Sequence, residues 1–82
     1  MEITCDEVKR QSNLSKHGYD FAELDLAFFE RATILSGHHG RLLDVGQFDD
    51  TIVSVIFRPL GSEALSVISM RDASFKERRL AR

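Results

Sequence analysis

The sequence predicts an α+β fold made of a short N-terminal strand, two helices, an antiparallel β-meander of about four strands and a C-terminal helix. Two observations predict it. The N-terminal half of the chain has apolar residues at helical spacing that follow helix-capping residues. The C-terminal half has alternating apolar segments separated by short stretches of turn formers, which is typical of consecutive hairpins.

Length and composition favour one ordinary globular unit. The chain has 82 residues, of which 43% are hydrophobic and 29% charged, so we expect residues 1–82 to form a single domain. A lone Cys5 cannot form an intramolecular disulfide, and the first residues lack the apolar stretch of a secretory signal. No segment reaches the roughly 20 apolar residues of a membrane helix. We therefore expect a cytoplasmic protein that does not enter the membrane.

The first elements are a short strand and a helix. Ile3 and Thr4 favour a strand, and Asp6 can cap a helix that runs to about His17. Gly18 follows as the C-terminal stop.

One side of this helix is polar and partly cationic. At 100° per residue, Lys9, Asn13, Lys16 and His17 fall with Asp6 within an arc of about 100°. One interpretation is a face that offers donors to phosphate groups, and the other is a solvated face. His17 has a further structural interpretation, because a histidine at a helix C-terminus interacts favourably with the helix dipole.

The second helix is expected to supply the core. Asp20 marks its start, and Phe21, Leu24 and Phe28 follow at helical spacing, with Arg31 near its end. Such a stripe of apolar side chains indicates packing against a sheet rather than a cofactor pocket.

The rest of the chain, up to the C-terminal helix, reads as strands joined by short turns. The segments 49–51 and 59–63 are rich in turn formers and favour hairpins. The expected strands are Thr33–Leu35, Arg41–Phe48, Ile52–Arg58 and Ala64 to about Arg71.

Pairing the strands about their turns predicts two different faces. If Gln47 opposes Ile52 and Arg58 opposes Ala64, one face is mostly apolar and should lie under the helices. This face carries Leu42, Asp44, Gly46, Val53, Val55, Phe57, Leu65 and Val67, with Ser69 following by alternation. The other face carries Arg41, Leu43, Val45, Gln47, Ile52, Ser54, Ile56, Arg58, Ser66 and Ile68, with Met70 following by alternation.

The second face brings arginines together. In this register Arg41 and Arg58 are cross-strand neighbours, and like charges in such a pair are unfavourable unless an anion or a carboxylate lies between them. With Arg71 from the last strand, they are expected to meet over one pocket that binds a phosphate.

The C-terminal segment is basic in a chain of net charge −2. Ser74 and Glu77 form the capping box of a last helix. From residue 71 to residue 82 there are five basic and two acidic residues, which indicates an anionic partner. Arg78 and Arg79 are also favourable near a helix C-terminus without any ligand.

The available chemistry is limited to arginines, a histidine and carboxylates. Nucleotide-binding glycine loops, nucleophile elbows and zinc-protease motifs are absent from the sequence, and its Cys and His residues lack recognised ligand spacing. We therefore predict no cofactor and no metal site.

That inventory suits cleavage of an RNA phosphodiester by its own 2′-hydroxyl, because the substrate supplies the nucleophile. Arginines would stabilise the charge that builds on the phosphorane oxygens, and His17 would transfer a proton. Glu77 or Asp72 would take part in proton transfer or merely orient an arginine.

Both ends of the chain resemble one known family. The segments ITCDEVKRQSNLSKHGYDF and ISMRDASFKER, together with the strand Arg41–Gly46, resemble the BrnT ribonuclease toxins of bacterial type II toxin–antitoxin pairs, which share the fold of RelE toxins. The matching positions are Asp6, Lys9, Asn13, Lys16, His17, Gly18, Phe21, Ile68, Ser69, Arg71, Ala73, Glu77 and Arg78.

The resemblance implies a growth-inhibiting, metal-independent endoribonuclease that a BrnA-like antitoxin neutralises. Such antitoxins typically carry a ribbon-helix-helix domain, so DNA would be bound only through the partner, and a heterotetramer is one implied assembly. The candidate catalytic residues are Arg41, Arg58, Arg71, His17 and Glu77, and the candidate RNA-binding residues are Lys9, Lys16, Arg78 and Arg79.

Three positions depart from the family pattern. The family usually has an aromatic residue at Cys5, commonly an arginine at Ser66 and often a histidine at Arg58. The missing cation at Ser66 raises an alternative, a catalytically weak or inactive module that binds antitoxin and acts in operon autoregulation. Arg58, which faces the same way in the expected register, is a candidate replacement for that cation. A free-standing DNA-binding protein is less favoured, because no helix-turn-helix pattern is convincing.

Overall fold

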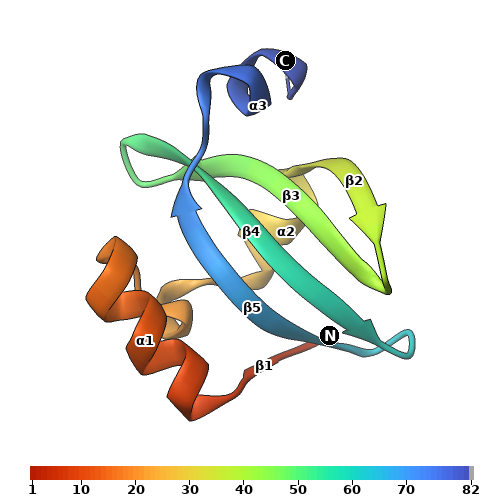
Figure 1. Ribbon diagram of the computed structural model, residues 1–82. Helices are drawn as coiled ribbons and strands as arrows, with labels where there is room; N and C mark the ends of the chain where they lie inside the picture. Colours follow the sequence, from red (N-terminus) through yellow and green to blue (C-terminus); the bar gives the residue numbers. More distant parts are fainter. Residues whose placement is uncertain (82) are drawn as a thin grey trace.

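The computed structural model describes residues 1–81, whose elements follow the predicted order. The strands are β1 (Glu2–Cys5), β2 (Thr33–His38), β3 (Arg41–Phe48), β4 (Thr51–Leu60) and β5 (Ala64–Asp72). The helices are α1 (Glu7–His17), α2 (Leu26–Arg31) and α3 (Phe75–Leu80), with a 3₁₀ turn at Phe21–Glu23. The α+β prediction is confirmed, and Figure 1 shows α2 behind the sheet and α3 beyond the end of β5.

The strands form one sheet in the order β1-β5-β4-β3-β2. Strands β2 to β5 are the predicted antiparallel meander. Strand β1 adds a parallel neighbour to β5, but it pairs only with the first part of that strand, from Ala64 to Val67. The remaining edge of β5 is therefore open to α1, which lies beside it (Figure 1).

Helix α1 has the predicted ends. Asp6 accepts a hydrogen bond from the backbone N–H of Lys9 at 3.0 Å. Gly18 adopts a left-handed conformation with φ of 78°, and its N–H donates to the carbonyl of Leu14. This geometry ends the helix at His17, because residues with a side chain rarely adopt that φ.

The second predicted helix is split into two pieces. Asp20 accepts from the N–H of Ala22 and starts only a 3₁₀ turn. Asp25 then accepts from the N–H of Phe28 at 2.9 Å and starts α2 anew. The prediction of one helix is wrong here, because a second capping aspartate interrupts it. Arg31 ends α2 as predicted.

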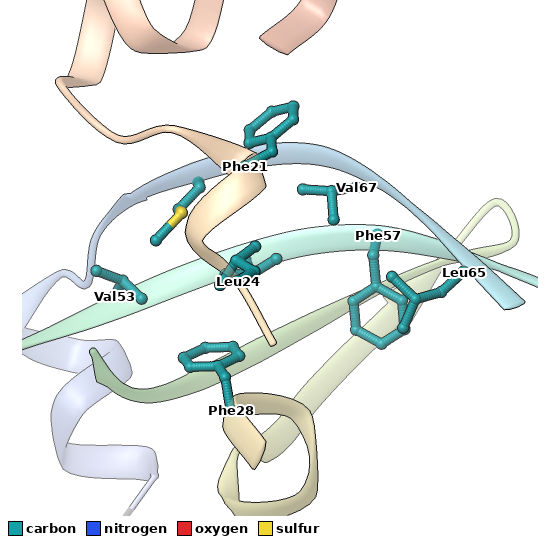
Figure 2. Packing of buried hydrophobic residues seen from close by; sticks show 9 residues of the cluster. Phe21, Leu24, Phe28, Val53, Phe57, Leu65 and Val67 are labelled. Carbon is teal, nitrogen blue, oxygen red and sulfur yellow. The ribbon is translucent and has the colours of Figure 1, made fainter. Parts of the chain in front are cut away.

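The core lies between α2, the 3₁₀ turn and the inner face of the sheet. Phe21, Leu24 and Phe28 point toward that face in Figure 2 and are all buried. They pack against Val53, Val55, Phe57, Leu65, Val67 and Met70. The apolar face predicted for β4 and for the first half of β5 is confirmed.

A β-bulge changes the second half of β5. The register shifts between Ile56 and Phe57, so that Ile56 opposes Ser69 while Phe57 opposes Val67. The extra residue moves Met70 to the inner face and Ser69 to the outer face, which reverses the prediction for both.

The two hairpins differ in how well their register was predicted. Gln47 opposes Ile52, so the predicted pairing of β3 with β4 is confirmed. The predicted pairing of Arg58 with Ala64 is wrong, because Arg58 opposes Ser66.

Within the residues that the structure describes, the outer face of the sheet is covered at one end only. There α3 lies over Val45 and Ser54, which are both buried although they point away from the core. Toward the other end this face carries Leu43 and Ile56, which are half-buried, and Arg58, which is exposed. No helix within residues 1–81 is long and apolar enough to cross a membrane.

The inner face contains one buried carboxyl group. Asp44 is 2% exposed, and its Oδ1 has no hydrogen-bond partner among residues 1–81. Burial raises the pKa of Asp44 to about 6, because the charged form loses its hydration. This residue is a local cost to the fold at neutral pH.

Candidate functional site

Helix α3 begins with the predicted capping box. The hydroxyl of Ser74 accepts from the N–H of Glu77 at 3.1 Å, and the N–H of Ser74 donates to Oε1 of Glu77 at 2.8 Å. Both bonds fix the position of the Glu77 side chain, which is directed at the sheet and is 15% exposed.

Glu77 holds Arg71 in a two-pronged ion pair, which we call the Arg71–Glu77 pair. Nη1 and Nη2 of Arg71 donate to Oε1 and Oε2 of Glu77, each at 2.8 Å. The hydroxyl of Ser54, the cross-strand neighbour of Arg71, also donates to Oε1 at 2.8 Å. The bonds from Arg71 hold the pKa of Glu77 well below its usual range, and Glu77 raises the pKa of Arg71.

These contacts decide between two roles for Glu77. A carboxylate with such a low pKa accepts protons poorly at neutral pH, so Glu77 is suited to orient Arg71 rather than to act as a base. Nη1 of Arg71 also donates to the carbonyl of Asp72. Because a guanidinium has five N–H donors, Nε–H and one Nη2–H remain along one edge for another anion.

A second part of the site lies between α1 and β5. There the side chain of Asn13 pairs with the backbone of β5, beyond the part of that strand that pairs with β1. Its Nδ2 donates to the carbonyl of Met70 at 2.9 Å, and its Oδ1 accepts from the N–H of Met70 at 3.0 Å. The predicted polar arc of α1 therefore faces the edge of the sheet. This contact leaves a hollow, which we call the α1–β5 hollow, lined by Lys9, Ser12, Asn13, Lys16, His17, Ile68 and Ser69.

The α1–β5 hollow adjoins the Arg71–Glu77 pair. Ser69 lines the hollow and lies on the outer face, two residues before Arg71 on the same face. Two residues along a strand correspond to about 7 Å between the Cα atoms of Ser69 and Arg71. The cations of α1 and Arg71 thus border one stretch of surface, and the bulge at Ile56 is what places Ser69 between them.

Arg41 and Arg58 lie toward the other end of the outer face. Arg58 and Ser54, the partner of Arg71, are four positions apart on β4, which corresponds to about 13 Å. The prediction that Arg41, Arg58 and Arg71 meet over one pocket is therefore wrong. The pairwise part of the prediction still holds. Leu42 opposes Phe57, and the same register continued by one residue sets Arg41 beside Arg58.

The remaining predicted cations lie on different sides of α3. Arg78 lines a separate hollow with Arg31, Thr33, Val45, Gly46, Gln47, Ile52 and Ala81. Arg79 lies over the ring of Phe75, with Cζ at 5.8 Å from the ring centroid.

Three contributors to the site were not predicted. Ser54 is 1% exposed and bonds to Glu77, but in sequence it resembles any small polar residue among valines. Ser69 reaches the site only because of the bulge, which has no clear sequence signal. Helical spacing places Asn13 in the polar arc of α1, but spacing alone does not predict its bonds to β5.

The protein is of the α+β class: a mixed sheet has α2 on its inner face, α1 beside its β5 edge and α3 over one end of its outer face, and the cationic residues lie at that edge. Within that class, the model of the family described as "Ribonuclease toxin, BrnT, of type II toxin-antitoxin system" matches residues 5–77. The chain belongs to this family, and membership of a type II system implies an antitoxin partner.

A solved structure agrees with this assignment. The 1.1 Å crystal structure of the ribonuclease toxin BrnT from Brucella abortus shares 53% sequence identity with this chain. The match covers 90% of this chain and 97% of that one, with a TM-score of 0.85. No match was found among the curated proteins.

Proposed function

We propose that this chain is a metal-independent endoribonuclease that cleaves RNA beside the Arg71–Glu77 pair. In this reaction the 2′-oxygen of a ribose attacks the adjacent phosphorus, and the bond from phosphorus to the 5′-oxygen breaks. The 2′-hydroxyl loses a proton and the 5′-oxygen gains one, which leaves a 2′,3′-cyclic phosphate and a 5′-hydroxyl. The observation that carries the proposal is an oriented arginine next to a cationic hollow that contains a histidine.

Arg71 would stabilise the phosphorane. Its Nε–H and its remaining Nη2–H form an edge that matches two phosphate oxygens, while Glu77 keeps the guanidinium from rotating away. An arginine held in advance loses little freedom when the charge on phosphorus develops.

His17 would exchange the proton. It lines the α1–β5 hollow with Lys9 and Lys16, so an RNA strand bound there by its phosphates passes next to the imidazole. Lys9 and Lys16 would bind the phosphates on either side of the one that reacts.

Arg41 and Arg58 would bind RNA away from the point of cleavage. They share the outer face with Arg71 but lie too far along it to contact the same phosphate in this conformation. Arg58 opposes Ser66, where the family commonly has an arginine, so Arg58 can present a cation at nearly the same place.

The second candidate function is an inactive module that acts only through its antitoxin. Ser66 favours it, and the position of Arg58 argues against it. For the partner itself we propose a BrnA-like antitoxin with a ribbon-helix-helix domain, which would form a heterotetramer with this chain and provide the contacts to DNA.

The direct test is the chemistry of the product ends. Purified protein is incubated with single-stranded RNA in the presence and absence of EDTA, and the fragments are analysed by mass spectrometry. We expect 2′,3′-cyclic phosphates in both samples, and no cleavage of a matched 2′-O-methyl RNA. Intact RNA together with normal growth of cells that express the chain alone would leave the inactive module as the better account.

A further inference from the structure

The solvent-facing side of α3 carries two exposed apolar residues. Phe75 is 76% exposed and Leu80 is 59% exposed. They line a hollow together with Lys76 and Arg79, and the guanidinium of Arg79 lies over the Phe75 ring. The patch therefore joins an exposed aromatic ring to two cations, which suits a ligand that has flat apolar groups and negative charge.

The charge of this side of α3 is entirely positive. Glu77 is the only carboxylate in the helix FKERRL, and it is turned to the sheet and bonded to Arg71. Asp72, just before the helix, accepts a hydrogen bond from the hydroxyl of Tyr19. Both acidic residues between positions 72 and 80 are therefore bonded elsewhere, and the patch is complementary to a polyanion.

We propose that Phe75 is a stacking platform for a base of the single-stranded RNA substrate, with Lys76 and Arg79 binding the flanking phosphates. The proposal rests on the ribonuclease function proposed above and deepens it. Unpaired bases stack on aromatic rings and on guanidinium planes, and the backbone beside them is attracted by cations. The Phe75 ring with Arg79 above it offers both kinds of surface.

The location suits a strand that is cleaved at Arg71. Helix α3 has six residues and is therefore about 9 Å long, so a few nucleotides span it. Glu77 orients Arg71 on one side of this helix while Phe75 faces solvent on the other. A base held on Phe75 would fix where along the strand the reacting phosphate falls.

The chain offers a direct optical test, because it contains no tryptophan. A Phe75→Trp variant places the only indole in the proposed platform, and the ligand is a 2′-O-methyl RNA oligonucleotide that cannot be cleaved by its own 2′-oxygen. Ile34→Trp is the control, since Ile34 is 60% exposed and pairs with Asp44 on the inner face of the sheet, whereas α3 lies over the outer face.

We expect the oligonucleotide to quench Phe75→Trp but not Ile34→Trp, and inorganic polyphosphate to quench neither. We also expect Phe75→Ala to weaken binding of the oligonucleotide by about 5- to 150-fold, while Phe75→Trp binds like the wild type. Thermal unfolding of each variant shows whether it is folded.

Two results would overturn the stacking role. One is that the oligonucleotide does not quench the indole of Phe75→Trp and binds Phe75→Ala with wild-type affinity. The other is an indole that responds to the antitoxin alone, which would make the patch a protein interface. Cleavage of unmodified RNA is scored separately: cleavage without quenching removes only the stacking role, and quenching without cleavage removes only the nuclease.

Discussion

Arg71 and Glu77 form a bidentate ion pair, in which each nitrogen–oxygen distance is 2.8 Å. The pair connects the last strand to the last helix, and Ser54 adds a third bond from the middle of the sheet. The rigidity of Arg71 therefore comes from three separate elements. In the proposed mechanism this is what turns a half-exposed arginine into a preorganised group.

Removal of the charge on Glu77 tests that preorganisation. Glu77→Gln keeps a carbonyl for the capping box but loses the ion pair, so we expect kcat for RNA cleavage to fall by about 100-fold with little change in KM. Glu23→Gln, at an exposed residue, is the matched control. Equal kcat values for both variants would show that Glu77 does not position Arg71.

Asp44 is expected to make stability depend on pH in the direction opposite to that of a usual carboxylate. Its folded-state pKa of about 6 lies above the ordinary 3.8, so its contribution to stability is complete below pH 3.8 and is lost as the pH rises through 6. We expect Asp44→Asn to raise the free energy of unfolding at pH 7.5 by about 1–3 kcal/mol, and to lose this advantage at pH 4.

Urea unfolding at both pH values measures the effect, with the exposed Asp49→Asn as control. A gain for Asp44→Asn that is the same at pH 4 and pH 7.5 would rule out ionisation as its cause.

The bonds between Asn13 and Met70 are expected to hold α1 on the sheet. Asn13→Ala leaves a buried N–H and a buried carbonyl of β5 without partners, which should lower the free energy of unfolding by about 2–4 kcal/mol. Ser15→Ala, on the exposed side of α1, should change it little. Hydrogen exchange at the amide of Met70 should accelerate only in the first variant, and an unchanged rate would contradict the anchoring role.

Because Arg58 and Ser66 are cross-strand neighbours, we expect an arginine at position 66 to replace the arginine at position 58. Arg58→Ser should weaken RNA binding and lower the slope of log affinity against log salt by about one, because one phosphate contact is lost. Adding Ser66→Arg should restore both quantities. A double variant that binds no better than Arg58→Ser would show that the cation is needed at one position only.

Local rules predicted the ends of the elements well. Asp6, Gly18, Ser74 and Glu77 act within a few residues of themselves, so their capping roles follow from sequence alone. The inner face was also predictable as far as Val67, because alternation holds wherever pairing is regular.

The part of the site that could not be predicted depends on one extra residue. The bulge opposite Ile56 reverses the alternation, so that Ser69 and Arg71 share the outer face and Met70 enters the core. A bulge is decided by pairing across two strands, and a single sequence holds little information about it. The same shift moves Arg71 to the outer face that carries Arg58, but the two residues remain about four positions apart along the sheet, which is too far for one pocket.

The most direct test of the proposed site is the rate of RNA cleavage by Arg71 variants under single-turnover conditions. We expect Arg71→Ala to be slower than the wild type by at least about 100-fold, and Arg71→Lys to recover only part of the loss, because an ammonium group cannot bind Glu77 and a phosphate in the same plane. Both variants are first shown to be folded by thermal unfolding. Cleavage by folded Arg71→Ala at the wild-type rate would contradict the assignment of the site.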